Sequence, residues 1–280
     1  MISYKNVSRQ YGKIRAVDAL DLQIPKGEFF GLLGPNGAGK TTIIRLTTAL
    51  TSVTSGSIEI DGEPIHRDLS KTKRRFGIVP QYSNLESELT ARENLEYHGR
   101  LYGMPSALRK SRITELLEFA ELSERADEKT DGYSGGMRRR LMIIKALMHS
   151  PDLLFLDEPT VGLDVSARRK IWDLLRIMNR RGLTIFLTTH YLEEAQALCR
   201  RVGLIDYGKL IRLDSPEAIT GQYGKYVLEY FQESGTEYRF FSDRDAAVKA
   251  AETIDGVFQV REANLEDAFI QLTNRRISDQ

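Results

Sequence analysis

The first 24 residues alternate between apolar and polar positions, a pattern typical of strands that bury one face. Two alternating runs lie within residues 2–24, and the turn residues Tyr11, Gly12 and Lys13 stand between them. The pattern predicts two antiparallel strands at an edge of the fold.

Four later runs are almost entirely apolar, as expected for strands that are buried on both faces of a parallel sheet. These runs are residues 28–33, 76–79, 153–156 and 184–188. The first leads through a glycine-rich turn into residues 42–46, which have helical spacing, and residues 167–180 show the same spacing between the last two runs. A helix between two buried strands implies a βαβ unit, so we predict an α/β core.

From residue 90 to residue 149 the pattern is mostly helical. Thr90 and Glu93 have the spacing of a capping box, which predicts a helix start, and residues 103–105 (Gly-Met-Pro) interrupt the helical pattern. We therefore predict a helical insertion over about residues 82–149.

Beyond Pro216 the composition shifts toward tyrosine, glutamate and glycine, with short alternating stretches. This change predicts a small α+β appendage over residues 221–280, with residues 1–220 as the main domain.

Composition narrows the class of protein only in part. The chain has 280 residues, 41% of them hydrophobic, which is enough for a sizeable core. Its net charge of +1 provides no general attraction for nucleic acid. The single cysteine, Cys199, is compatible with a reducing compartment. No run of eighteen apolar residues occurs, so we expect that the chain does not span a membrane by itself.

The glycine-rich turn after residues 28–33 matches the phosphate-loop pattern in full. Its glycines let backbone N–H groups converge on phosphates, Lys40 can reach the β- and γ-phosphates of a nucleotide, and Thr41 offers a hydroxyl to Mg²⁺. The predicted ATP-binding residues here are Gly34, Pro35, Asn36, Gly37, Ala38, Gly39, Lys40, Thr41 and Thr42.

Asp157 and Glu158 follow the buried run 153–156 directly, at the strand end where α/β sheets collect ligands. We predict that Asp157 holds Mg²⁺ and that Glu158 polarises the water that attacks the γ-phosphate. Without the phosphate loop, the same two residues would be read as a helix cap or a solvated corner.

Four further motifs give the chain its resemblance to the ABC (ATP-binding cassette) ATPases. The segment Tyr133-Ser134-Gly135-Gly136-Met137 resembles the Leu-Ser-Gly-Gly-Gln signature of that family, with changes at its first and last positions. Gln81 matches the Q-loop, Asp164 lies in the D-loop region, and His190 matches the switch histidine. The resemblance covers about residues 2–216 and implies a P-loop NTPase fold with a helical signature subdomain.

The resemblance also implies roles for these residues. ATP would be held between two cassettes, with Ser134, Gly135, Gly136 and Met137 of each chain facing the nucleotide of the other. Gln81 would join Thr41 and Asp157 as a Mg²⁺ ligand and would also belong to the catalytic group with Glu158 and His190. His190 would contact the γ-phosphate. Tyr11 would stack on adenine. The basic run at residues 138–140 is interpreted as a solvated helix face.

Residues 133–141, 158–164 and 265–269 resemble the subfamily that energises ABC-2-type exporters, including those for drugs and lipo-oligosaccharides. This implies a separate multi-spanning permease that contacts the helical insertion, a second cassette, and a place on the cytoplasmic face of the cell membrane. No nucleic-acid partner is expected.

Two other classes of protein share part of this pattern. Soluble ABC ATPases act on DNA or ribosomes, but the former carry a long coiled-coil insertion and the latter usually carry two cassettes. A small-molecule kinase with a phosphate loop would leave Ser134, Gly135, Gly136 and His190 unexplained.

Overall fold

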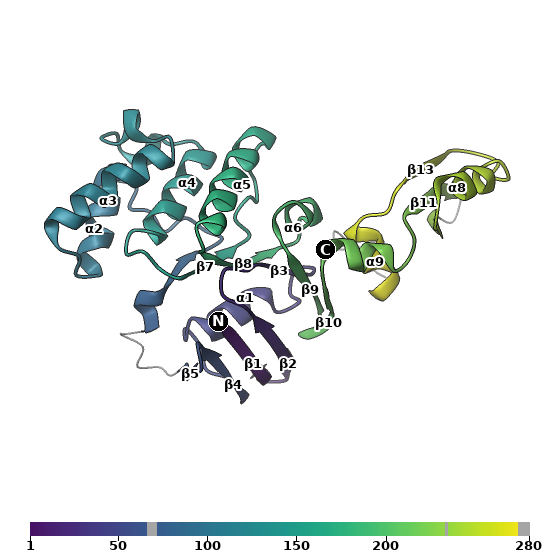
Figure 1. The fold of residues 1–280 in the computed structure, drawn as a ribbon, viewed down its shortest axis with the longest axis horizontal. Coiled ribbons are helices and arrows are strands. Elements are labelled where there is room, and N and C mark those ends of the chain that lie inside the picture. The colour runs from purple at the N-terminus through teal and green to yellow at the C-terminus, as the bar shows by residue number, and fades with distance from the viewer. Residues whose placement is uncertain (66–71, 233–234, 274–280) are drawn as a thin grey trace.

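The computed structural model describes residues 1–65, 72–232 and 235–273. Six strands form its central sheet in the order β10-β9-β3-β8-β7-β6 (Figure 1). The neighbouring strands β9, β3, β8, β7 and β6 run parallel, and β10 is antiparallel to β9. The four apolar runs become strands of this sheet, so the predicted parallel core is confirmed. Its members are β3 (Phe29–Leu33), β6 (Phe76–Val79), β7 (Leu153–Asp157), β8 (Thr184–Thr189), β9 (Arg201–Asp206) and β10 (Lys209–Asp214).

The two alternating N-terminal runs are antiparallel strands, as predicted, and they belong to a second sheet of order β2-β1-β4-β5. Helix α1 (Lys40–Thr47) follows β3, and its residues Ile43 and Ile44 pack in the hydrophobic cluster that also holds Phe30 and Ile2. Burial of one face of the second sheet explains the alternation. The four strands are β1 (Ile2–Tyr11), β2 (Ile14–Ile24), β4 (Ser55–Ile60) and β5 (Glu63–Pro64).

The predicted helical insertion contains α2 (Ala91–Leu101), α3 (Ser106–Phe119) and α4 (Gly135–Ala146). The Thr90 hydroxyl accepts from Glu93 N at 3.1 Å and Glu93 Oε2 accepts from Thr90 N at 2.8 Å, so the capping box is confirmed. Single 3-10 turns lie among these helices at η2 (Ser123–Arg125) and η3 (Thr130–Gly132), and a third, η1 (Thr72–Arg75), directly precedes β6. The central sheet carries two further helices, α5 (Val165–Arg180) between β7 and β8, and α6 (Leu192–Leu198) after β8.

The C-terminal region forms an antiparallel sheet of order β12-β11-β13 with a small core of its own around Leu228 and Tyr230. Figure 1 shows β11, β13 and α8 at the end of the molecule opposite α2 and α3. In α9, Leu265 and Phe269 are fully buried in the hydrophobic core of the main domain, so this last helix anchors the region. The elements are α7 (Pro216–Gly221), β11 (Tyr226–Gln232), β12 (Gly235–Phe241), α8 (Arg244–Ala251), β13 (Phe258–Glu262) and α9 (Leu265–Thr273); residues 274–280 of the predicted appendage lie outside the described residues.

Candidate functional site

The phosphate loop connects β3 to α1 and is shaped by glycines at two positions where a side chain would clash with neighbouring backbone. Gly39 has φ 107°, in the left-handed region, and a Cβ at this position would lie 2.3 Å from the carbonyl oxygen of Ala16. A Cβ at Gly34 would lie 2.2 Å from the carbonyl oxygen of Ile205. The loop therefore packs closely against the backbone at Ala16 and at Ile205, and this packing fixes the direction of its N–H groups at the start of α1.

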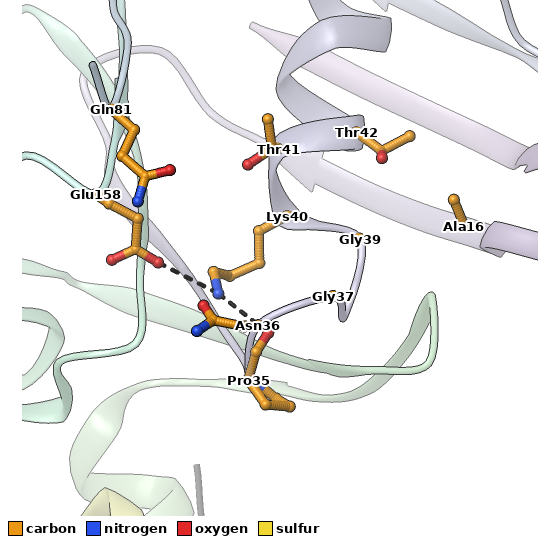
Figure 2. Close-up of a pocket in the computed structure, with 10 residues that line it drawn as sticks. All are labelled: Ala16, Pro35, Asn36, Gly37, Gly39, Lys40, Thr41, Thr42, Gln81 and Glu158. Atoms are coloured by element: carbon orange, nitrogen blue, oxygen red, sulfur yellow. Dashed lines mark hydrogen bonds and ion pairs between the residues drawn. The ribbon is translucent and has the colours of Figure 1, made fainter. Parts of the chain in front are cut away.

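A pocket of about 160 Å³ lies over this loop (Figure 2). This volume is smaller than the roughly 300–1,000 Å³ typical of small-molecule sites, and the pocket is open to solvent. Both features fit a site that binds only the phosphates and is closed on its outer side by another protein surface. Its lining residues are Ala16, Pro35, Asn36, Gly37, Gly39, Lys40, Thr41, Thr42, Gln81 and Glu158.

Lys40 provides the positive charge of the pocket. Its Nζ donates to the carbonyl oxygens of Gly34 at 2.7 Å and Pro35 at 3.2 Å, and it lies 3.3 Å from Oε1 of Glu158 (Figure 2). The side chains of Lys40 and Glu158 are each only 6% exposed. The ammonium group is thus oriented by the loop and neutralised by a carboxylate that an incoming phosphate can displace.

Asp157 supplies the second carboxylate at the end of β7. The Thr41 hydroxyl donates to its Oδ2 at 3.0 Å, and the Thr188 hydroxyl of the adjacent strand β8 donates to its Oδ1 at 2.5 Å. Asp157 itself is not a lining residue of the pocket, but Thr41, to which it is bonded, lines it together with Gln81 from the end of β6. This set of oxygen donors fits Mg²⁺, which binds through one or two carboxylates together with substrate phosphates and water.

Glu158 is held on two sides. Opposite Lys40, its Oε2 lies 2.8 Å from Nδ1 of His190 and accepts from the His190 backbone N at 3.3 Å. Glu158 has a positive φ of 49°, which is unfavourable for a residue with a side chain, and its N–H donates to Thr188 O at 3.0 Å. The sheet thus holds one strained residue so that its carboxylate faces the phosphate loop.

The signature residues lie at the N-terminus of α4. Ser134 is the N-cap and its hydroxyl accepts from Met137 N at 3.3 Å. Gly135 and Gly136 face the start of α5, where a Cβ on Gly136 would lie 2.8 Å from Cβ of Ala167. None of the four is among the residues that line the pocket of their own chain.

Tyr11 and Asp164 also lie apart from the pocket lining, as do Gly34, Ala38, Asp157 and His190. Tyr11 is 41% exposed at the end of β1, with the guanidinium carbon of Arg9 4.4 Å from its ring centre. Asp164 caps α5, where its Oδ1 accepts from Ala167 N at 2.8 Å. The stacking role of Tyr11 stays a prediction; the residue of the β1–β2 hairpin that lines the pocket is Ala16 of β2.

Sequence reasoning missed two buried charged residues near the site. Glu194 is fully buried, accepts from Trp172 Nε1 at 3.1 Å, and has its pKa raised by burial. Arg139 is 7% exposed, so the interpretation of residues 138–140 as a solvated face is wrong for it. The signal was the helical period, which places Arg139 on the face of Met142 and Ile143.

Comparison with known proteins agrees with this geometry. The family model described as "ABC transporter" matches residues 17–161. The chain is similar to the protein named "Nod factor export ATP-binding protein I" of Cupriavidus metallidurans, with 42% identity over 100% of this chain and 99% of that one. The protein of the same name from Paraburkholderia xenovorans is 40% identical over 99% of this chain and 98% of that one.

Solved structures show the same relationship. The chain is similar to the cassette MJ0796, whose dimeric post-hydrolysis state bound to ADP and Pi has 32% sequence identity and a TM-score of 0.69, covering 77% of this chain and 98% of that one. The match in family model, full-length relatives and fold means that this chain belongs to the ABC transporter family, as one of its ATP-binding ATPase subunits.

Proposed function

We propose that this chain hydrolyses ATP to drive an ABC-2-type exporter whose membrane-spanning part is a separate polypeptide. The observation that carries the hydrolytic part is the placement of Glu158 between Lys40 and His190, 3.3 Å from the first and 2.8 Å from the second. A carboxylate held between a phosphate-binding lysine and a histidine is suited to activate water beside a γ-phosphate.

In this proposal the phosphate loop binds the nucleotide. Backbone N–H groups of residues 36–42 and the Lys40 ammonium hold the β- and γ-phosphates at the N-terminus of α1. The phosphate takes the place of Glu158 at Lys40, which frees the carboxylate to accept a proton from the attacking water. His190 keeps the carboxylate oriented through the Nδ1 contact and offers its remaining ring nitrogen to the γ-phosphate.

Thr41, Asp157 and Gln81 are proposed to hold Mg²⁺. Thr41 of α1 and Gln81 after β6 line the pocket, and the Asp157 carboxylate at the end of β7 is bonded directly to the Thr41 hydroxyl. When bound, the ion would neutralise charge on the phosphate oxygens.

A second copy of the chain is proposed to complete the site. Ser134, Gly135, Gly136 and Met137 lie at a helix N-terminus that favours negative charge, outside the pocket of their own chain. In a symmetric pair this surface would face the partner's ATP, with Asp164 close to the contact and Tyr11 stacked on adenine. The similar cassette MJ0796 is described as dimeric, which supports this arrangement.

The export role rests on the full-length relatives named for Nod factor export. Across residues 1–65, 72–232 and 235–273, no helix is both long enough and apolar enough to cross a membrane. A permease contact on the helical insertion, about residues 82–149, would place the chain on the cytoplasmic face of the cell membrane. Exposed apolar side chains are present there for such a contact: Tyr82 (80% exposed), Tyr97 (50%), Leu101 (66%) and Leu108 (54%).

We divide the chain accordingly into an ATPase domain at residues 1–220 and an accessory region at residues 221–280. Phosphate release by the purified full-length chain, with and without Mg²⁺, tests the hydrolytic part. Activity that is Mg²⁺-dependent and lost in Glu158→Gln is expected; full activity in Glu158→Gln would remove this residue from its role. Photo-crosslinking from position 82 in membranes tests the export part, since a multi-spanning protein is the expected product and crosslinks to soluble proteins alone would contradict it.

A further inference from the structure

Arg139 lies on the second turn of α4, the helix that begins at the signature residues. Its neighbour Arg138 is exposed to solvent, whereas Arg139 is 7% exposed. Burying a guanidinium group carries a desolvation penalty, and an apolar side chain would fill the same space without it. The charge and the hydrogen-bonding capacity of Arg139 therefore need an explanation.

The guanidinium group of Arg139 joins α4 to the ends of two strands. Nη1 donates to Pro80 O at 2.7 Å, and Nη2 donates to Gln81 O at 2.9 Å. Nη2 also lies at 3.5 Å from Glu158 O, a weaker contact. These carbonyl groups belong to the turn after β6 and the end of β7, which are adjacent parallel strands. A single side chain thus contacts the backbone of both Gln81 and Glu158.

Carbonyl oxygens are the direct partners of this charge. Across the described residues, no carboxylate lies within salt-bridge distance of Arg139. Burial lowers the pKa of Arg139, and the negative charges of Glu194 and Asp157 act in the opposite direction. Arginine suits this position because its planar fork reaches two separate carbonyl groups at once, which a lysine ammonium on one stem cannot do with the same geometry.

The position of Arg139 within α4 links two surfaces through one rigid element. Arg139 lies five positions after Ser134, which corresponds to about 7.5 Å along a helix axis. A displacement of the signature residues by a nucleotide therefore also displaces the guanidinium group and the two strand ends bound to it.

We propose that Arg139 is a positioning residue that couples the signature surface of the chain to Gln81 and Glu158 in the ATP site of the same chain. The inference rests on the proposed function, since it needs ATP hydrolysis in a pair of cassettes. It predicts that each chain aligns its own Glu158 only when its signature has engaged the ATP of its partner, so that the two sites of the pair act in concert.

Steady-state kinetics of the full chain give the first test. Arg139→Met removes both hydrogen bonds at similar volume, and Arg139→Lys keeps the charge without the fork. Arg180→Met, at the exposed C-terminal end of α5, is the control. Because a small misplacement of catalytic groups costs up to roughly 100-fold, we expect kcat to fall by about 10- to 100-fold in both Arg139 variants. Their affinity for ATP should stay within about threefold of wild type, since the phosphate loop is untouched, and Arg180→Met should behave as wild type.

Two outcomes of this test would overturn the inference. A kcat within about twofold of wild type in Arg139→Met would show that the contacts do not position the site. A parallel loss of ATP affinity, kcat and melting temperature in both variants would show a purely structural role. A wild-type chain without any ATPase activity would instead be a failure of the proposed function.

Mixed pairs identify which site Arg139 serves. One chain keeps Glu158 and the other carries Glu158→Gln, so that a single site turns over, and single-turnover hydrolysis is measured after purification with two tags. Arg139→Met in the chain that keeps Glu158 is expected to slow hydrolysis strongly. The same change in the Glu158→Gln chain, whose signature faces the active site, is expected to have a small effect. The reverse order would mean that Arg139 serves only the signature, and would overturn the proposal.

Discussion

Replacing Glu158 with glutamine is expected to strengthen ATP binding and to remove most turnover. In the structure Glu158 Oε1 lies 3.3 Å from Lys40 Nζ, in a pocket where both side chains are 6% exposed. Two unit charges at that separation attract each other by about 5 kcal/mol at an effective dielectric constant of about 20, before desolvation is counted. An incoming phosphate has to displace the Glu158 carboxylate from Lys40 and is also repelled by its negative charge.

The net effect on binding is smaller than the gross attraction. A hydrogen bond to a charged group contributes about 1.5–3 kcal/mol after exchange with water. The lower end of that range corresponds to roughly tenfold tighter binding of ATP by the variant. Loss of a general base costs roughly 10²- to 10⁴-fold in rate, so kcat is expected to fall by at least about 100-fold.

Titration with Mg²⁺ and a non-hydrolysable ATP analogue, at protein concentrations that keep the chain monomeric, measures the first effect. Phosphate release measures the second. Glu193→Gln is the matched control, because its carboxylate is 85% exposed and lies 3.8 Å from Arg168. Weaker analogue binding in Glu158→Gln than in wild type would refute the account of the Lys40 pair. Turnover above about a tenth of wild type would refute the role of Glu158 as the base.

Three further changes test other parts of the account. Lys40→Ala is expected to weaken ATP binding by roughly 10- to 100-fold, because a charged donor to the phosphates is lost, and unchanged affinity in an equilibrium titration would contradict the loop assignment. Gly39→Ala places a Cβ 2.3 Å from Ala16 O at φ 107°, so thermal denaturation should show a loss of more than about 1 kcal/mol together with weaker ATP binding; a stable, active variant would contradict the strain argument. Burial lowers the pKa of His98 from 6.5 to about 4, so between these pH values the unfolded chain binds a proton that the folded chain does not. The contribution of neutral His98 to the free energy of unfolding is therefore complete above pH 6.5 and is lost as the pH falls toward 4. Between pH 7 and pH 5 the free energy of unfolding in urea should fall by about 2 kcal/mol less in His98→Phe than in wild type. An equal fall in the two proteins would refute the assignment of this pH dependence to His98.

The sequence predicted those parts of the fold that depend on local pattern. Buried parallel strands are continuous apolar runs, so β3, β6, β7 and β8 could be recognised without a structure. The alternating strands β1 and β2 were recognised as well, but not their pairing with β4 in a separate sheet. Pairing between distant strands depends on contacts that a local period does not contain.

The C-terminal region shows the same limit. Its composition predicted an α+β unit, and the sheet with α8 has its own small core. The packing of α9 into the main core was not predicted. It depends on Leu265 and Phe269 meeting α6 and α7, and on Arg261 of β13, which binds Asp267 through two hydrogen bonds of 2.6 and 2.7 Å.

For the candidate site, the sequence identified residues whose chemistry is tied to a motif, such as Lys40 and Glu158. It did not identify Arg139, because three arginines in a row look like a solvated surface unless the helical period is followed through them. The pairing of Glu158 with Lys40 and His190 also required the sheet order, since the three residues come from different elements.

The central claim is that this ATPase works on a membrane permease. The measurement that tests it most directly is affinity purification of the tagged chain from gently solubilised membranes, with quantitative mass spectrometry of the material that accompanies it. The account predicts a multi-spanning membrane protein in stoichiometric amount, retained in the Glu158→Gln variant with ATP. Ribosomal proteins, nucleic acid or soluble proteins alone would contradict the export function while leaving the ATPase chemistry in place.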